Sequence, residues 1–261
     1  MAGSLTIGSF GMTLEQLSWE TLEAARDADV VYSQSLGSRE DDPSREFLKK
    51  LCPGARLAGA AGPGGSLADA VLEELRAGRR VLYLTYGHPL FLSAGASELA
   101  ARCHEEGFAC RTQHAVSSLD MLLPEVGAAD LRYGMFLAAM DSWSEGCRRP
   151  SLRADVPTLV FCLDSAGRAA REHLLEDFAR AYPPEHPVEV LRCPSLGSSS
   201  FSRECFSISR LREALARAGS VGTIYVPASF GPPRIPSLWR RWLRAIQAAR
   251  REWLETAEPP R

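Results

Sequence analysis

The residues best suited to chemistry form the stretch Tyr86-Gly87-His88-Pro89. The run RRVLYLTYG (79–87) is continuously apolar and rich in β-formers, which predicts a central strand. The turn that follows lies at the carboxyl end of this strand, where open α/β folds bind ligands. Gly87 lets a ligand approach the main chain closely, and Pro89 stiffens the loop. The turn is therefore a candidate binding site. The alternative is a plain connection in which His88 is a hydrogen-bonded loop histidine.

Two further loops are expected on the same side of the sheet. The stretch His114–Asp120 follows another strand and opens a helix, and the hydroxyls of Ser117 and Ser118 suit a carboxylate or a ribose, although a serine N-cap would have the same sequence. Asp120 is either an acid or base or part of a solvated helix face. The loop GSFG, with Gly8 and Gly11, is too short for the GxGxxG pattern, which argues against a standard dinucleotide site.

Cysteine and histidine spacing argues against metal chemistry. The seven cysteines form no CxxC pair, and the five histidines form no HExxH motif and no close His/Cys cluster. We therefore expect no metal site. The cysteines are expected to be buried or partly buried reduced thiols, since their number is odd and they are widely scattered.

The first half of the chain alternates strands and helices, which predicts a mostly parallel sheet covered by helices. Strands are expected at 4–10, 28–33, 79–87 and 108–113, and helices at 13–27, 38–51, 67–78, 96–107 and 117–126. The Gly/Ala/Pro-rich stretch 56–66 reads as a loop.

The second half changes pattern near residues 124–130, which predicts a separate α+β domain with a mixed sheet. Strands are expected at 132–141, 157–163, 186–194 and 222–228, with helices at 166–182 and 207–218. Residues 236–255 combine tryptophans and leucines with arginines, which indicates an amphipathic helix. It packs on the body or on a partner subunit, or binds a nucleic acid or a membrane surface.

Composition places the chain among globular proteins with a large core. It has 261 residues, 45% hydrophobic and 24% charged, and a formal net charge of −2. With 30 basic and 32 acidic side chains there is no positive field for a polyanion, so no nucleic-acid partner is expected. No apolar stretch approaches the roughly 18 to 20 residues of a membrane span, and the N-terminus lacks a secretory signal. We expect a cytoplasmic enzyme or small-ligand binder that does not bind membranes.

The order of motifs resembles a known superfamily. The N-terminal strand with its glycine loop, then AARDADVVYS, LYLTYGHPLFLSAGASELAARCHEEGF and HAVSSLDMLL, resemble the tetrapyrrole methylases, the class III S-adenosylmethionine-dependent methyltransferases, whose loop is usually Gly-Asp-Pro. The Tyr-Gly-His-Pro form is similar to the borosin branch, which N-methylates backbone amides of a ribosomal peptide. PEHPVEVLRCPSL and LREALARAGSVGTIYVPAS also resemble that branch, so the resemblance covers residues 3–245.

The resemblance implies a two-domain tetrapyrrole-methylase-like α/β fold, divided into residues 1–125 and 126–261, with S-adenosylmethionine bound between the domains. It also implies a homodimer. Tyr86 is the expected catalytic residue, an aromatic ring beside the sulfonium. The implied cofactor residues are Gly8, Tyr86, Gly87, His88, Pro89, Leu90, Phe91, Ser117 and Ser118 from the first domain, and Phe161, Cys162, Leu163, Cys193 and Thr223 from the second.

One segment departs from the borosin pattern. Where borosins place tyrosines and an arginine, this chain has Ala58–Ala70, which contains neither residue type. The sequence therefore leaves several functions open. The first is a methyltransferase that acts on a peptide supplied in trans or on another specialised metabolite. The second is a non-methylating member that binds S-adenosylmethionine or a peptide. The others are a hydrolase or isomerase that uses the same cleft, and a tetrapyrrole methylase.

Overall fold

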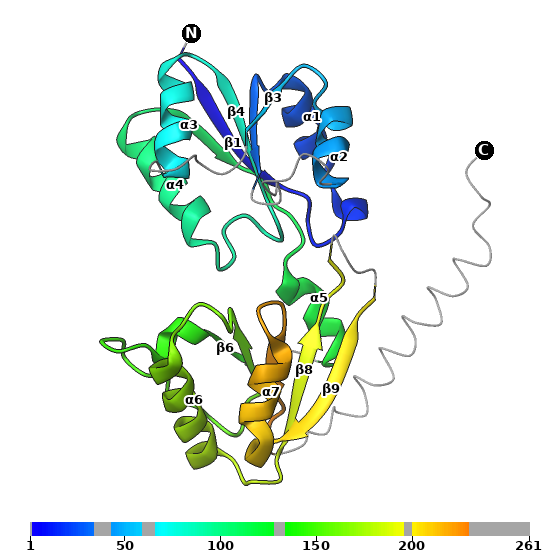
Figure 1. Ribbon diagram of the computed structural model, residues 1–261, viewed down its shortest axis with the longest axis vertical. Helices are drawn as coiled ribbons and strands as arrows, with labels where there is room; N and C mark the ends of the chain where they lie inside the picture. The colour runs from blue at the N-terminus through cyan, green and yellow to red at the C-terminus, as the bar shows by residue number, and fades with distance from the viewer. Residues whose placement is uncertain (1, 34–42, 59–65, 128–133, 196–199, 230–261) are drawn as a thin grey trace, which may run out of the picture.

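The computed structural model describes the chain except for residues 1, 34–42, 59–65, 128–133, 196–199 and 230–261. Most of the segment that replaces the borosin tyrosines and arginine lies outside the described residues, as does the predicted amphipathic helix at 236–255. The described chain forms two sheets, each with its own helices, arranged one above the other in Figure 1. The predicted fold class is thereby confirmed.

The first sheet is entirely parallel. Its strands are β1 (Ser4–Ser9), β2 (Val30–Ser33), β3 (Arg56–Ala58), β4 (Arg80–Thr85) and β5 (Ala109–Thr112), in the order β3-β2-β4-β1-β5. The central strands are apolar along their length because helices cover both faces. Helices α3 (Leu67–Arg76) and α4 (Ala94–Glu105) bury one face, and α1 (Trp19–Asp27) and α2 (Pro43–Leu51) bury the other.

Two local predictions in the first half are wrong. The helix expected over 13–27 is broken, because Leu17 is extended and Ser18 starts α1 by accepting a hydrogen bond from the Thr21 amide. Only a short 3-10 turn, Leu14–Gln16, precedes the break. Arg56–Ala58, expected to be a loop, is strand β3, because its backbone pairs with β2 despite its weak local preference.

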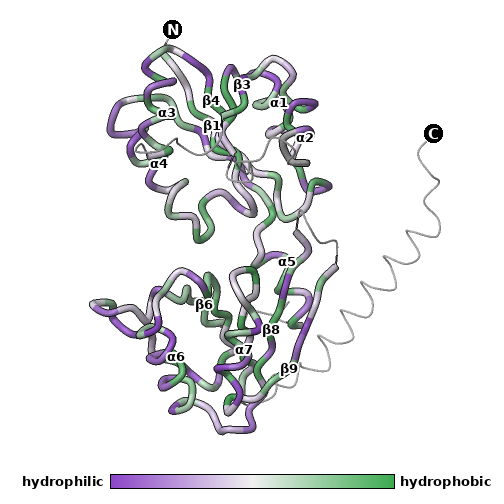
Figure 2. Tube along the Cα trace, in the orientation of Figure 1, coloured by the Kyte–Doolittle hydropathy of each residue, from purple (hydrophilic) through white to green (hydrophobic). Residues whose placement is uncertain are grey.

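The second sheet is mixed. Its strands are β6 (Phe136–Ala139), β7 (Thr158–Phe161), β8 (Pro187–Arg192), β9 (Ser202–Ser207) and β10 (Thr223–Val226), in the order β6-β7-β10-β8-β9. Only β6 and β7 pair in parallel. The sequence did not predict β9, because its residues SRECFS are mostly polar and include no apolar run; in the structure their exposure alternates along much of the strand, as in an edge strand with one solvated face. In Figure 2 the hydrophobic residues concentrate in the strands of both sheets.

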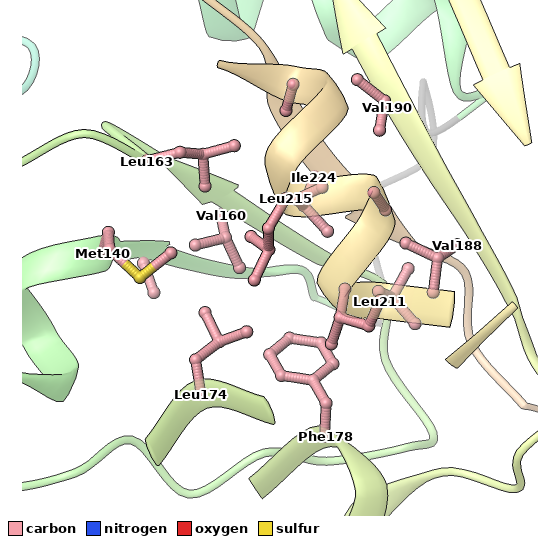
Figure 3. Close-up of a cluster of buried hydrophobic side chains, with 14 of the residues drawn as sticks. Met140, Val160, Leu163, Leu174, Phe178, Val188, Val190, Leu211, Leu215 and Ile224 are labelled. Atoms are coloured by element: carbon pink, nitrogen blue, oxygen red, sulfur yellow. The ribbon is translucent and has the colours of Figure 1, made fainter. Parts of the chain in front are cut away.

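Helices cover both faces of the second sheet. Leu174 and Phe178 of α6 (Arg168–Ala181) and Leu211 and Leu215 of α7 (Leu211–Ala218) pack against the strands in a cluster that includes Val188, Val190 and Ile224 (Figure 3). On the other face, Leu122 of α5 (Ser118–Glu125) contacts a cluster with Leu159 and Leu191. Helix α5 thus packs on the second sheet, although it lies on the N-terminal side of the expected division at 125/126. No helix in the described part of the chain is long and apolar enough to cross a membrane.

Candidate functional site

A pocket of about 680 Å³ lies between the two sheets. Its volume falls in the range of small-molecule and cofactor sites. Most of the residues implied by the resemblance line it. From the first part of the chain these are Tyr86, Gly87, His88, Phe91 and Ser118, and from the second sheet they are Phe161, Cys162, Cys193 and Thr223. Residues far apart in sequence are therefore gathered around one cavity.

The loop after β4 is fastened to the loop after β1. The Gly87 amide donates to the Gly11 carbonyl over 2.9 Å. The buried Ser9 hydroxyl lies within hydrogen-bond reach of the carbonyls of Thr85, at 3.1 Å, and Gly87, and accepts from the Gly11 amide at 2.9 Å. Gly11 and Gly87 have φ values of +74° and +70°, a conformation that glycine adopts without steric cost. These bonds hold the pocket loop in a defined shape.

Two pocket residues have unusual backbone conformations. Among the described residues, Leu92 and Cys162 are the non-glycine residues with positive φ, at 55° and 53°. Both line the pocket, one from each side. Such conformations cost about 1–3 kcal/mol and concentrate at binding and active sites. The turn after β7 holds Cys162 in place, since the Ser165 amide and hydroxyl both donate to its carbonyl, at 2.9 and 2.8 Å.

Two contacts join the walls of the pocket. The Phe91 ring meets the Phe161 ring edge to face, with centroids 5.5 Å apart. The Cys193 thiol lies 3.8 Å from the Ser118 carbonyl, at the start of α5. The loop of the first sheet is thus packed directly against strand ends of the second.

The phenol and the two thiols in the pocket wall are held in their neutral forms, whereas Asp164 and Arg192 add one acidic and one basic side chain to the lining. Burial raises the pKa of Tyr86 to about 12 and that of Cys193 to about 11, and it also raises the pKa of Cys162. A neutral phenol and neutral thiols do not act as nucleophiles or anionic bases. Tyr86 retains 41% exposure, so its ring is open to a ligand. Cys162 and Cys193 are wall residues.

Two histidines meet at the edge of the pocket. His88 Nε2 lies 3.3 Å from His114 Nδ1, and the Leu90 amide donates to His88 Nδ1 over 3.3 Å. The sequence did not suggest this pair, because 26 residues separate the two histidines and only the fold brings them together.

The remaining predicted residues do not line this pocket. Gly8 makes room for Gln113, since a Cβ on Gly8 would lie 2.9 Å from Gln113 Oε1. Ser117 is the N-cap of α5, where its hydroxyl accepts from the Asp120 amide and its own amide donates to the Asp120 carboxylate. Leu163 is buried in the second-sheet core of Figure 3. Pro89 and Leu90 lie in the loop itself, with Leu90 exposed.

Asp120 is a capping residue in this structure. The Ser117 hydroxyl and amide, which bind its carboxylate, are the main causes that lower its pKa. A carboxylate held in this way is a weak base, so the helix cap accounts for Asp120 without an acid–base role.

The pocket also contains residues that the sequence did not suggest. The loop after β8 and strand β9 supply Ser195, Ser200 and Ser202, and the turn before β10 supplies Ser220, Val221 and Gly222. Nothing local in the sequence indicated that Ser195, Ser200 and Ser202 line the same pocket as Tyr86. Arg192, the one permanently cationic side chain among the described lining residues, donates to Glu204 at 2.7 Å and to the Arg217 carbonyl at 2.5 Å.

Two of the seven cysteines depart from the expected burial. Cys147 and Cys205 are exposed, whereas the other five are buried or half-buried. Cys147 follows the turn after Trp143, and Cys205 lies on the edge strand β9, and no described residue buries either thiol.

Two packed sheets with a ligand-sized pocket at their strand ends define a two-domain α/β fold, and comparison identifies its family. A family model described as Tetrapyrrole (Corrin/Porphyrin) Methylases matches residues 11–192. This match covers more than half of the chain, so the chain belongs to the tetrapyrrole methylase family. The resemblance read from the Tyr86-Gly87-His88-Pro89 loop is confirmed.

Two relatives carry the borosin name. One, from Mycena rosella, is a methyltransferase/ribosomally synthesized type I borosin cyclic peptide precursor; it is 24% identical over 255 residues, which cover 90% of this chain and 61% of the relative. The other, a type II borosin precursor from Phlebiopsis gigantea, is 24% identical over 253 residues and matches 86% of this chain and 43% of its own length. The chain thus spans about three-fifths of the first relative and less than half of the second.

Solved structures show the same fold. Uroporphyrin-III-C-methyltransferase from Thermus thermophilus gives a TM-score of 0.64 at 20% identity, over 87% of this chain and 93% of that one. Cobalt precorrin-4 methyltransferase gives 0.65 at 17% identity, over 88% and 96%. A complex of the Thermus thermophilus enzyme with S-adenyl homocysteine gives 0.62 at 18% identity, over 86% and 92%. S-adenosylmethionine is the methyl donor of this family, which confirms the predicted cofactor.

The pocket suits this donor. It combines aromatic and aliphatic walls with hydroxyls and backbone amides, which are the groups needed by an adenosyl group and an amino-acid zwitterion. Ser93 lines it, and the Ser93 hydroxyl is buried without a hydrogen-bond partner among the described residues. A ligand that bonded to this hydroxyl would remove a cost of about 1–3 kcal/mol.

Proposed function

We propose that the protein is an S-adenosylmethionine-dependent methyltransferase whose acceptor is a neutral peptide. The observation that carries this proposal is the largely apolar pocket between the two sheets, lined by the Tyr86–Phe91 loop, in which the cation Arg192 is already paired with Glu204. The bound donor would supply a methyl group activated by its positive sulfonium. The protein's own residues bind it, orient it and exclude water, which together account for much of the acceleration of a displacement reaction.

Each wall has a defined task in this proposal. The Tyr86 ring offers an aromatic face to a cation, and its phenol, with a pKa of about 12, remains a hydrogen-bond donor at neutral pH. The fixed Gly11–Gly87 backbone pair lets the donor approach the main chain. The Phe91–Phe161 contact supplies an apolar, water-excluding wall.

The charges of the pocket favour a neutral acceptor over a tetrapyrrole. Uroporphyrin-type tetrapyrroles carry several carboxylates, and binding such a molecule requires cations that are free to pair with them. Arg192 is already held by Glu204 and the Arg217 carbonyl, and the lining also contains the acidic side chain of Asp164, which disfavours a polyanion. By contrast, Tyr86, Leu92 and Val221 line the pocket as exposed large hydrophobic side chains. The borosin-named relatives support a peptide as this neutral, apolar acceptor.

Two measurements test the proposal. Calorimetry with S-adenosylmethionine and S-adenosylhomocysteine should give micromolar dissociation constants. Mass spectrometry after incubation with the donor should show added methyl groups on an apolar peptide and none on uroporphyrinogen III. Methylation of uroporphyrinogen alone would overturn the choice of acceptor. Absence of binding to either cofactor form would overturn the methyltransferase itself.

A binding protein that does not transfer methyl groups is the second candidate. The favouring observation is that Ala58, at the end of β3, begins a segment with none of the tyrosines or arginine of the borosin pattern. Micromolar cofactor binding without methylation of any peptide in a panel that varies in sequence would support this candidate.

A further inference from the structure

The histidine pair at the pocket edge has a hydrogen-bond pattern that fixes the protons on both rings. A neutral imidazole has one N–H donor and one acceptor nitrogen. His88 Nδ1 accepts from the Leu90 amide, so the proton of neutral His88 is on Nε2. Nε2 then donates to His114 Nδ1, which places the proton of neutral His114 on Nε2. Two contacts thus favour the Nε2–H tautomer of His88: the Leu90 amide on one nitrogen and the His114 acceptor on the other.

The two histidines have different positions relative to the pocket. His88 lines it, in the loop between β4 and α4. His114 does not line it; it lies in the connection from β5 to α5, the segment through which the chain passes from the first sheet to the second. The pair therefore connects the pocket loop to this crossing segment. Asp120 of α5 also interacts electrostatically with His88.

This arrangement excludes one role for His88. A general base must offer a free nitrogen to the substrate. Both nitrogens of His88 are engaged, one by the Leu90 amide and the other by His114. The ring can therefore shape the pocket wall without accepting a proton from the acceptor.

We propose that His114 is a positioning residue: it holds His88 as the Nε2–H tautomer and thereby fixes the Gly87–Leu90 turn in its binding-competent shape before the cofactor arrives. The effect on cofactor affinity rests on the proposed function, whereas the tautomer assigned to His88 does not depend on what the protein binds. A turn that is already ordered lowers the entropic cost of binding the cofactor. Loss of the His88–His114 contact should therefore weaken cofactor affinity.

The first test is spectroscopic and needs no ligand. Long-range ¹H–¹⁵N spectra at about pH 8, above the ordinary range of histidine, should show His88 protonated on Nε2 and unprotonated on Nδ1. In His114→Ala, the ¹⁵N shifts of His88 should move toward those of a tautomer mixture. A His88 ring protonated on Nδ1 in the parent protein, or unchanged in the variant, overturns the inference whatever the protein binds.

The second test compares variants by calorimetry with S-adenosylhomocysteine. His114→Ala should raise the dissociation constant about three- to tenfold, as expected for one hydrogen bond of about 0.5–1.5 kcal/mol. His114→Asn, whose amide oxygen can occupy the place of Nδ1, should restore affinity to within about twofold of the parent. His104→Ala, which removes an exposed histidine at the end of α4 outside the pocket, is the control and should not change the affinity.

The outcomes separate the two proposals. Equal affinity in His114→Ala and the parent overturns the positioning role while leaving the methyltransferase intact. If neither the parent protein nor any variant binds the cofactor but His88 has the expected tautomer, the methyltransferase proposal fails and the hydrogen-bond assignment stands. Failure of His114→Asn to restore binding, with unchanged melting temperature, also contradicts the role assigned to Nδ1.

Discussion

Tyr86 shows how the environment sets what a residue can do. A tyrosine in a cleft could serve as a base only if its phenol ionised readily. Here burial, together with the nearby Cys193, raises its pKa to about 12. The residue therefore contributes an aromatic face and a hydrogen-bond donor.

Substitutions at Tyr86 should separate these two contributions. We expect Tyr86→Ala to weaken S-adenosylmethionine binding about three- to thirtyfold, since a cation–π contact is worth about 0.5–2 kcal/mol. Tyr86→Phe keeps the ring and should remain within about threefold. Calorimetry gives both constants. An equal loss in the two variants would show that the phenol, not the ring, is the contact.

The raised pKa of Tyr86 also has a consequence at alkaline pH. The folded protein favours the neutral phenol of Tyr86. Tyr86 therefore stabilises the folded state fully at a pH below its ordinary pKa of 10.0, and this stabilisation is lost as the pH rises toward about 12. Partial exposure of the side chain reduces the size of the effect. Urea titrations between pH 9 and pH 11 should show a shallower decline for Tyr86→Phe than for the parent. Parallel declines would contradict this assignment.

At the scale of elements, the site depends on how two strand ends are joined. β1 and β4 are parallel neighbours, so their carboxyl ends emerge side by side. The buried Ser9 hydroxyl then connects both following loops through Thr85, Gly87 and Gly11. A small polar side chain at the end of one strand thus determines the shape of the loop after the other.

We expect Ser9→Ala to reduce the free energy of unfolding by about 1–3 kcal/mol, because buried carbonyl and amide groups lose their partner. Cofactor affinity should fall as well. Ser97→Ala is the matched control, since the exposed Ser97 hydroxyl donates to the carbonyl of Ser93, the N-cap of α4, over 3.0 Å. This substitution should change the free energy of unfolding by less than about 0.5 kcal/mol. Urea unfolding measures both. Equal effects would contradict the role of Ser9.

At the scale of the whole molecule, the pocket exists only where the two sheets meet. Each sheet has its own hydrophobic clusters, so each can hold its strands without the other. The aromatic contact between Phe91 and Phe161 and the packing of α5 on the second sheet connect them. Cofactor affinity should therefore depend on contacts that contribute little to either core.

Phe91→Ala tests this dependence. The aromatic pair contributes about 0.5–1.5 kcal/mol beyond buried area, and its loss should loosen the closed pocket. Amide hydrogen exchange should rise in the Tyr86–Phe91 loop and near Phe161, with weaker binding of S-adenosylhomocysteine. Phe108 is partly buried against the core of the first sheet, and Phe108→Ala should lower stability without a selective rise in exchange at the pocket. Uniform exchange in both variants would contradict the proposed coupling.

The sequence by itself determined the alternation of strands and helices, the position of the Tyr86-Gly87-His88-Pro89 turn at a strand end and the family. Each depends on local properties: apolar periodicity, the conformational freedom of glycine and the order of motifs along the chain. Only the tertiary structure decided which of these residues meet. It placed His114 beside His88 and packed α5 on the second sheet. It also made Ser117 the N-cap of α5, buried Leu163 in the core of the second sheet and formed the edge strand β9. The physical reason is that hydrogen bonds and burial between distant segments depend on distances in space, which local sequence does not specify.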